Sequence, residues 1–110
     1  MTAPVADPHD FFGAETLQNP YPMYDRMRAQ APVHRVGDSE FYAVCGWDAL
    51  IDAVNRVEDF SSNLTATMVY HEDGTVTPFE MIEAGSPNHA LATADAPTHA
   101  AHRKILLPHL

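Results

Sequence analysis

The stretch that decides the fold is ADAPTHAAHRKILLP, residues 94–108 of this sequence. Asp95 is suited to cap the free backbone N–H groups of a helix, and Pro97 fits a first helical turn because proline has no N–H to leave unbonded. Mostly apolar and basic residues then follow until Pro108, which should kink or end the helix. The stretch therefore predicts a helix that starts at about residue 95.

The predicted helix carries a basic pair, His99 and Arg103. The two residues are four positions apart, so on a helix they lie one above the other on the same face. Together they suit a carboxylate ligand, because arginine presents a planar fork to two oxygens and histidine adds a further donor. The same spacing also agrees with an exposed basic turn near a helix C-terminus, where the helix dipole favours cations.

Three further elements are predicted upstream of this helix. A helix over about 19–30 begins at an Asn-Pro pair and places Met23 and Met27 on one side. Two β-rich runs joined by a Gly-Asp-Ser-Glu turn predict a hairpin over about 33–45. A helix over about 47–57 carries one apolar stripe, composed of Leu50, Ile51, Val54 and Val57.

The remaining segments show no clear periodicity. Residues 1–18 mix proline, aspartate, phenylalanine and glycine, and they predict an extended arm. Residues 63–94 are interrupted by glycine and proline, yet they contain apolar residues that need partners, among them Phe79, Met81 and Ile82. A long irregular stretch is usually functional or disordered. Together the segments predict a mainly α chain with a small β-hairpin, which is an α+β fold.

The composition excludes several classes of protein. The 110 residues carry a formal net charge of −9, which would repel a phosphate backbone, so no nucleic-acid partner is expected. Cys45 is the single cysteine, so an internal disulfide is impossible. The sequence shows no secretory signal and no apolar run of about 18 residues, so no membrane partner is expected either. These observations predict a cytoplasmic protein.

Residues 94–108 resemble a signature of the bacterial cytochrome P-450 family. In that family a D-P-P-x-H turn opens a helix, and H-x-x-x-R on this helix binds a haem propionate. Ala96 stands where the family often has proline, whereas Pro108 follows the arginine by five positions, as is common in the family. The order of upstream motifs is also similar: NPYP at 19–22, APV at 31–33, a hairpin, WDA at 47–49 and DFSS at 59–62.

The resemblance implies that the chain is the N-terminal part of a single cytochrome P-450 domain, truncated at its C-terminus. The whole protein would be a haem-thiolate monooxygenase that hydroxylates a small, apolar organic substrate, using O2 and electrons from a ferredoxin-type donor. Within this chain, His99 and Arg103 would bind a haem propionate. Part of the substrate pocket would be formed by Phe79, Met81 and Ile82.

Other motifs of the family are absent from this sequence. It contains no F-x-x-G-x-x-x-C-x-G loop for the iron ligand, no E-x-x-R, and no acidic-threonine pair on a long helix. Cys45 lies in a strand pattern before a Gly-Trp pair, so we expect a buried, inert small hydrophobe and not the iron ligand. The segment is therefore expected to hold no catalytic residue and to be inactive alone.

Two other functions agree with the residues alone. The chain could be a metal-binding module that combines His99 and His102 with His71, His89 or His109, although this spacing matches no standard zinc pattern. It could also be a small acidic interaction domain that folds by itself and binds no cofactor. Zinc titration would reveal the first, and a cooperative unfolding transition would favour the second.

Overall fold

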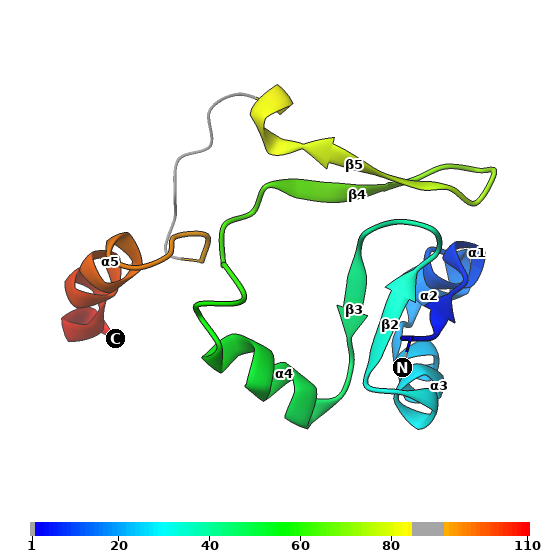
Figure 1. Ribbon diagram of the computed structural model, residues 1–110, viewed down its shortest axis with the longest axis horizontal. Coiled ribbons are helices and arrows are strands. Elements are labelled where there is room, and N and C mark those ends of the chain that lie inside the picture. Colours follow the sequence, from blue (N-terminus) through cyan, green and yellow to red (C-terminus); the bar gives the residue numbers. More distant parts are fainter. Residues whose placement is uncertain (1, 85–91) are drawn as a thin grey trace.

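Two separate sheets organise the chain. The computed structural model describes residues 2–84 and 92–110, and within them one sheet has the strand order β1-β2-β3 and the other is the pair β4-β5. Figure 1 shows helices α1 to α3 along one side of the first sheet and helix α5 on the far side of the molecule, beyond α4. The expected α+β class is confirmed, but the prediction of one hairpin in a mainly α chain is wrong, because a second hairpin is present.

The N-terminal segment is not an extended arm. It forms β1 (Val5–Ala6), α1 (Pro8–Phe11) and α2 (Ala14–Gln18). The side chain of Asp7 accepts a hydrogen bond from the backbone N–H of His9 at 3.0 Å and so caps α1. Strand β1 pairs in parallel with β2, which the sequence of residues 1–18 alone could not indicate.

The first hairpin and the helix before it follow the prediction. Helix α3 (Tyr21–Gln30) leads into β2 (Val33–Val36) and β3 (Tyr42–Val44), which pair antiparallel. Met23 and Met27, one helical turn apart, are buried against Ala6, and this small cluster is the core.

His34 joins the end of α3 to β2. Its side chain is 1% exposed, and its Nε2 lies 2.8 Å from the carbonyl oxygen of Met27 and 3.1 Å from that of Ala31. Because carbonyl oxygens only accept, Nε2 carries the proton and donates to the last turn of the helix. The imidazole therefore adds a second donor to the Met27 carbonyl, which already accepts the backbone N–H of Ala31 at 2.9 Å, and supplies a donor to the Ala31 carbonyl just beyond the helix.

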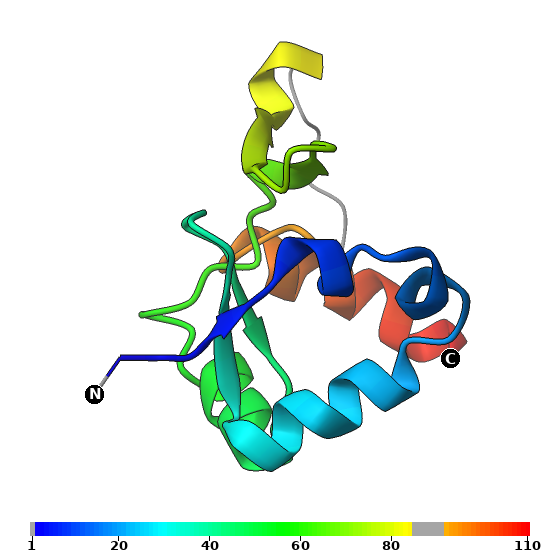
Figure 2. The same ribbon diagram turned by 90° about the vertical axis from the view of Figure 1, so that its right-hand side faces the viewer.

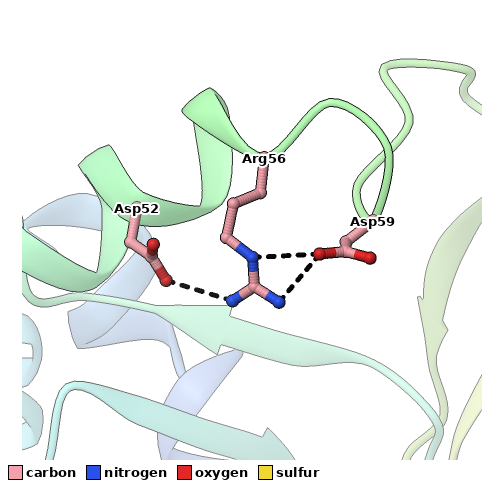
Figure 3. Close-up of polar contacts among 3 residues, drawn as sticks. All are labelled: Asp52, Arg56 and Asp59. Atoms are coloured by element: carbon pink, nitrogen blue, oxygen red, sulfur yellow. Dashed lines mark hydrogen bonds and ion pairs between the residues drawn. The ribbon is translucent and has the colours of Figure 1, made fainter.

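Helix α4 (Trp47–Asn55) ends two residues before the predicted boundary at about residue 57. Arg56, just beyond it, donates to Asp52 at 3.2 Å and to Asp59 at 2.8 and 3.0 Å, as Figure 3 shows. The guanidinium also lies 5.5 Å from the centre of the Phe60 ring. These contacts fix the turn by which the chain leaves α4.

The segment 63–94 was predicted to be irregular, but its first half forms a hairpin. Strands β4 (Ala66–Tyr70) and β5 (Val76–Glu80) pair antiparallel and are followed by the 3-10 helix η1 (Met81–Ala84). Gly74 provides the positive φ of 88° that the turn needs. Pro78 is tolerated inside β5 because a two-stranded sheet leaves one edge of each strand unpaired.

The second hairpin is attached to the N-terminal helices at its tip. The hydroxyl of Tyr70 lies 2.8 Å from Nδ1 of His9, and the Tyr70 ring stacks on Phe12 with centroids 5.2 Å apart. A Cβ atom at Gly74 would lie only 2.6 Å from Nε2 of His9, so a larger residue would displace the His9 ring in addition to straining the positive φ. Figure 2, turned by 90°, shows the rest of the hairpin projecting away from the first sheet.

The last helix, α5 (Thr98–Leu106), begins later than the predicted start at about residue 95. It continues into the 3-10 turn η2 (Leu107–His109), so the helix ends close to Pro108 as predicted. Among the described residues, no helix is long and apolar enough to cross a bilayer.

Candidate functional site

Helix α5 presents the predicted basic pair. His99 lies in its first turn, where its backbone N–H donates to the carbonyl of Asp95 at 2.8 Å, and Arg103 follows one turn later. The side chain of His99 is half-buried and that of Arg103 is exposed. Within residues 2–84 and 92–110, no hydrogen bond or ion pair occupies either side chain. Both sets of donors are therefore available to an external acceptor.

The donor set of this pair fits a carboxylate ligand. The guanidinium of Arg103 offers N–H groups in a planar fork, and the His99 imidazole adds one more donor from the same helix face. The haem group that the family resemblance implies carries two such carboxylates, its propionates. Arg103 also lies in the last turn of α5, where the helix dipole favours a cation without any ligand. The geometry is thus compatible with propionate binding and with an exposed basic turn.

Asp95 does not cap α5 as the sequence suggested. Helix α5 has Pro97 at its N-cap position, with no side-chain hydrogen bond there. The Asp95 carboxylate instead accepts the backbone N–H of Ser62 at 2.8 Å and the hydroxyl of Ser61. This contact has no signal in the sequence, because it spans more than 30 residues and Ser61 and Ser62 indicate only the end of the preceding helix.

The three residues predicted to line a substrate pocket lie close together but are not enclosed. Phe79 is on β5, where it pairs with Thr67, whereas Met81 and Ile82 are in η1. Ile82 is 78% exposed. A hollow of about 470 Å³ lies nearby, between the turn of the first hairpin and the second hairpin, and Val76, Pro78 and Glu80 contribute to it. The side chain of Phe79 lies on the face of β5 opposite to this hollow, because successive side chains alternate between the two faces of a strand.

Cys45 behaves as a structural residue. It is half-buried beside the Met23 and Met27 cluster, less deeply than predicted, and its Sγ lies 3.4 Å from the carbonyl oxygens of Ala31 and Pro32. Burial raises the pKa of the thiol, and the positive charge of Arg28 opposes this shift. The neutral thiol is therefore favoured over the thiolate that a metal ligand requires.

The histidines of the metal-module hypothesis are not gathered in one place. Among the described residues, no group of three or more His, Cys, Asp or Glu side chains could hold a metal ion. His71 bonds the hydroxyl of Thr77 at 2.8 Å in the second hairpin, far along the chain from His102 and His109. His89 lies outside the described residues.

Comparison with known proteins gives the family context. No family model matches the chain. The curated relatives that the chain matches are bacterial cytochromes P450, which confirms the resemblance drawn from its motifs. They are Cytochrome P450 144 of Mycobacterium tuberculosis from strains CDC 1551 / Oshkosh and ATCC 25618 / H37Rv, each 62% identical over 104 residues. The match covers 94% of this chain and 24% of each relative, so the chain spans about a quarter of their length.

Proposed function

We propose that this chain is the N-terminal part of a haem-thiolate monooxygenase, which hydroxylates a small, apolar organic substrate with O2 and electrons from a ferredoxin-type donor. The observation that carries the proposal is the 62% identity to a bacterial cytochrome P450 over 94% of the chain. The cytochrome P-450 fold and a cytoplasmic location belong to the same proposal. The iron-ligating cysteine and the oxygen-activating residues would lie outside these residues.

The open apolar faces of the helices support a role as part of a larger domain. Helices α4 and α5 contain no buried residue among those described. On the apolar face of α4, Val54 is 59% exposed, and at the end of α5 Leu107 is 51% exposed. Contiguous apolar surface of this kind marks a binding face. In the proposed protein, further polypeptide of the same domain covers these faces.

His99 and Arg103 would hold the haem through one propionate. Bound haem with a thiolate ligand supplies the O–O cleavage and the oxidising power of the reaction. Arg103 supplies a permanent positive charge and two parallel hydrogen bonds, and His99 supplies a third donor. The role of this chain is therefore to bind and orient the cofactor, not to move electrons or protons.

Phe79, Met81 and Ile82 would contribute apolar surface to the substrate pocket. Met81 is tied to the hairpin through its backbone N–H, which donates to the carbonyl of Thr65 at 2.8 Å. Ile82 follows with an exposed side chain, and Phe79 is 42% exposed. Such side chains exclude water and favour an apolar substrate over a charged one.

A hybrid protein tests the proposed function directly. In the hybrid, this chain replaces the matching segment of the Mycobacterium tuberculosis relative, and the unmodified relative is the control. The reduced carbonyl complex of the hybrid should absorb near ~450 nm, the marker of thiolate ligation, and the 110-residue chain alone should not. A folded hybrid that holds no haem, or this band in the chain alone, would contradict the proposal.

A further inference from the structure

Asp95 joins two segments that are far apart in the sequence. One carboxylate oxygen accepts the backbone N–H of Ser62 at 2.8 Å, and the other accepts the hydroxyl of Ser61. The Ser61 hydroxyl accepts in turn from the backbone N–H of Asn63 at 2.9 Å. The segment that leaves α4 is thereby fastened to the segment that enters α5.

The backbone of Asp95 also contacts the first turn of α5. Its carbonyl oxygen accepts the N–H of His99 at 2.8 Å, in the turn that leads into the helix. The residue before it, Ala94, is only 2% exposed, so the junction is packed on that side. Asp95 therefore connects the start of the helix that carries His99 and Arg103 to a fixed point beyond α4.

That fixed point is itself well defined. Arg56 forms ion pairs with Asp52 on α4 and with Asp59 in the turn (Figure 3). These ion pairs fix the backbone between the end of α4 and Ser61. The Arg56 guanidinium is charged at every ordinary pH, and hydrogen bonding to Asp59 and Asp52 raises its pKa further. A shallow hollow of about 190 Å³, lined by Val54, Phe60 and Asp95 among others, follows this junction.

We propose that Asp95 is a positioning residue for the cofactor-binding helix: it holds the first turn of α5 against Ser61 and Ser62 and thereby sets where His99 and Arg103 lie. The cofactor part of this inference rests on the proposed function, whereas the fastening of α5 does not. Asp95 touches neither the haem nor the substrate in this proposal and acts only through the first turn of α5, which it holds in place.

Asp73 provides a matched control. Its carboxylate also accepts one backbone N–H and one hydroxyl, both from Thr75, at 3.0 and 2.6 Å, and these bonds hold its pKa below the usual range. The donors are of the same kind as those at Asp95, but they lie two residues away in the turn between β4 and β5. Asp73→Ala therefore removes equivalent bonds without separating two segments.

The first experiment measures amide hydrogen exchange in the folded hybrid, where further polypeptide covers the apolar faces of α4 and α5. Asp95→Ala should speed exchange in α5 by about fivefold, and Ser61→Ala by about twofold, because each removes part of the fastening. Asp73→Ala should change exchange only around its own turn. The proposal would be overturned if α5 exchanged at the same rate in Asp95→Ala and in the unsubstituted protein. It would also be overturned if Asp73→Ala sped exchange in α5 as much as Asp95→Ala does, or if α5 showed no protection in the unsubstituted protein.

The second experiment measures haem transfer from the hybrid to an acceptor globin. Asp95→Ala should speed transfer by about fivefold in the wild-type background and by about twofold or less when Arg103 is already alanine, because the positioned group is then missing. The same factor in both backgrounds would indicate a general loss of stability and overturn the positioning role. A wild-type hybrid without haem would refute the proposed function, and the exchange experiment would still decide whether Asp95 fastens α5.

Discussion

Arg103 and His99 share one face of α5 but differ in the chemistry they bring to a carboxylate. Arginine is charged at every relevant pH and binds two oxygens at once, whereas the histidine imidazole offers a single donor to the same carboxylate. A charge-assisted hydrogen bond contributes about 1.5–3 kcal/mol and a neutral one about 1 kcal/mol. Arg103 should therefore contribute more to haem retention than His99.

The corresponding prediction concerns haem transfer from the hybrid to an acceptor globin. Arg103→Ala should weaken haem binding by about tenfold or more and His99→Ala by several-fold, since tenfold corresponds to about 1.4 kcal/mol. His102, about 100° round the helix from Arg103, is the control, and its replacement by alanine should have little effect. If His102→Ala releases haem fastest, the wrong face of α5 has been assigned to the cofactor.

Cys45 gives a prediction about pH. Because burial raises its pKa, the folded chain holds the neutral thiol at pH values where free cysteine already forms thiolate. Alkylation by iodoacetamide should therefore be slower than that of free cysteine near pH 8 and should rise at higher pH; urea should remove the difference. Mass spectrometry of the alkylated fraction over time measures this. Alkylation of the folded chain as fast as that of free cysteine would show that the thiol is not sheltered.

At the scale of elements, the join between α3 and β2 depends on His34. Leucine has a similar size but no donor, so the Met27 carbonyl keeps only the backbone N–H of Ala31, and the Ala31 carbonyl keeps only the weak thiol donor of Cys45. In the hybrid, His34→Leu should lower the free energy of unfolding by about 1–2 kcal/mol, because a buried carbonyl loses its strong donor. Urea denaturation followed by circular dichroism measures the change.

His71→Leu is the control for that prediction. His71 also bonds through its Nε2, to the Thr77 hydroxyl at 2.8 Å, but it is exposed on the second hairpin. Water can replace a lost bond there, so the change in stability should be within about 0.5 kcal/mol. Equal effects of the two substitutions would show that the burial of His34 is not what makes it important.

Elements with a local signal were predictable. Helices α3 and α4 and the first hairpin are encoded by an Asn-Pro start, an apolar stripe and a glycine turn. The second hairpin was missed because Gly74 and Pro78 usually interrupt regular structure, whereas here one forms the turn and the other lies in a two-stranded sheet. The short α1 was overlooked although Asp7 and Pro8 form an ordinary helix start.

The candidate site was also predictable only where its geometry is local. The shared helix face of His99 and Arg103 follows from their spacing of four positions, so it could be derived from five residues of sequence. The role of Asp95 could not be derived in this way, because its carboxylate accepts hydrogen bonds from Ser61 and Ser62, which lie more than 30 residues earlier in the sequence. Helix-capping preferences predict that the Asp95 carboxylate binds the free N–H groups at the start of α5. In the structure it binds Ser61 and Ser62 instead.

At the scale of the whole molecule, little apolar surface is removed from water. Five hydrophobic residues of the described chain are buried, and Ala6, Met23 and Met27 form the one cluster that they build. A core of this size cannot offset the conformational entropy lost on folding, which is already difficult for small domains. The apolar faces of α4 and α5 would supply the missing burial if further polypeptide covered them.

The last prediction therefore compares the isolated chain with the hybrid. The 110-residue chain should melt broadly and with weak cooperativity, because α4 and α5 are not held by a common core. A substitution at Val54, on the exposed apolar face of α4, should affect the isolated chain and the hybrid differently. Val54→Ser should leave the melting of the isolated chain unchanged, but it should destabilise the hybrid by about 2 kcal/mol, because valine would be buried there. Scanning calorimetry and circular dichroism measure both. A sharp two-state transition of the isolated chain, together with a hybrid that tolerates Val54→Ser, would instead indicate a small acidic domain that folds by itself.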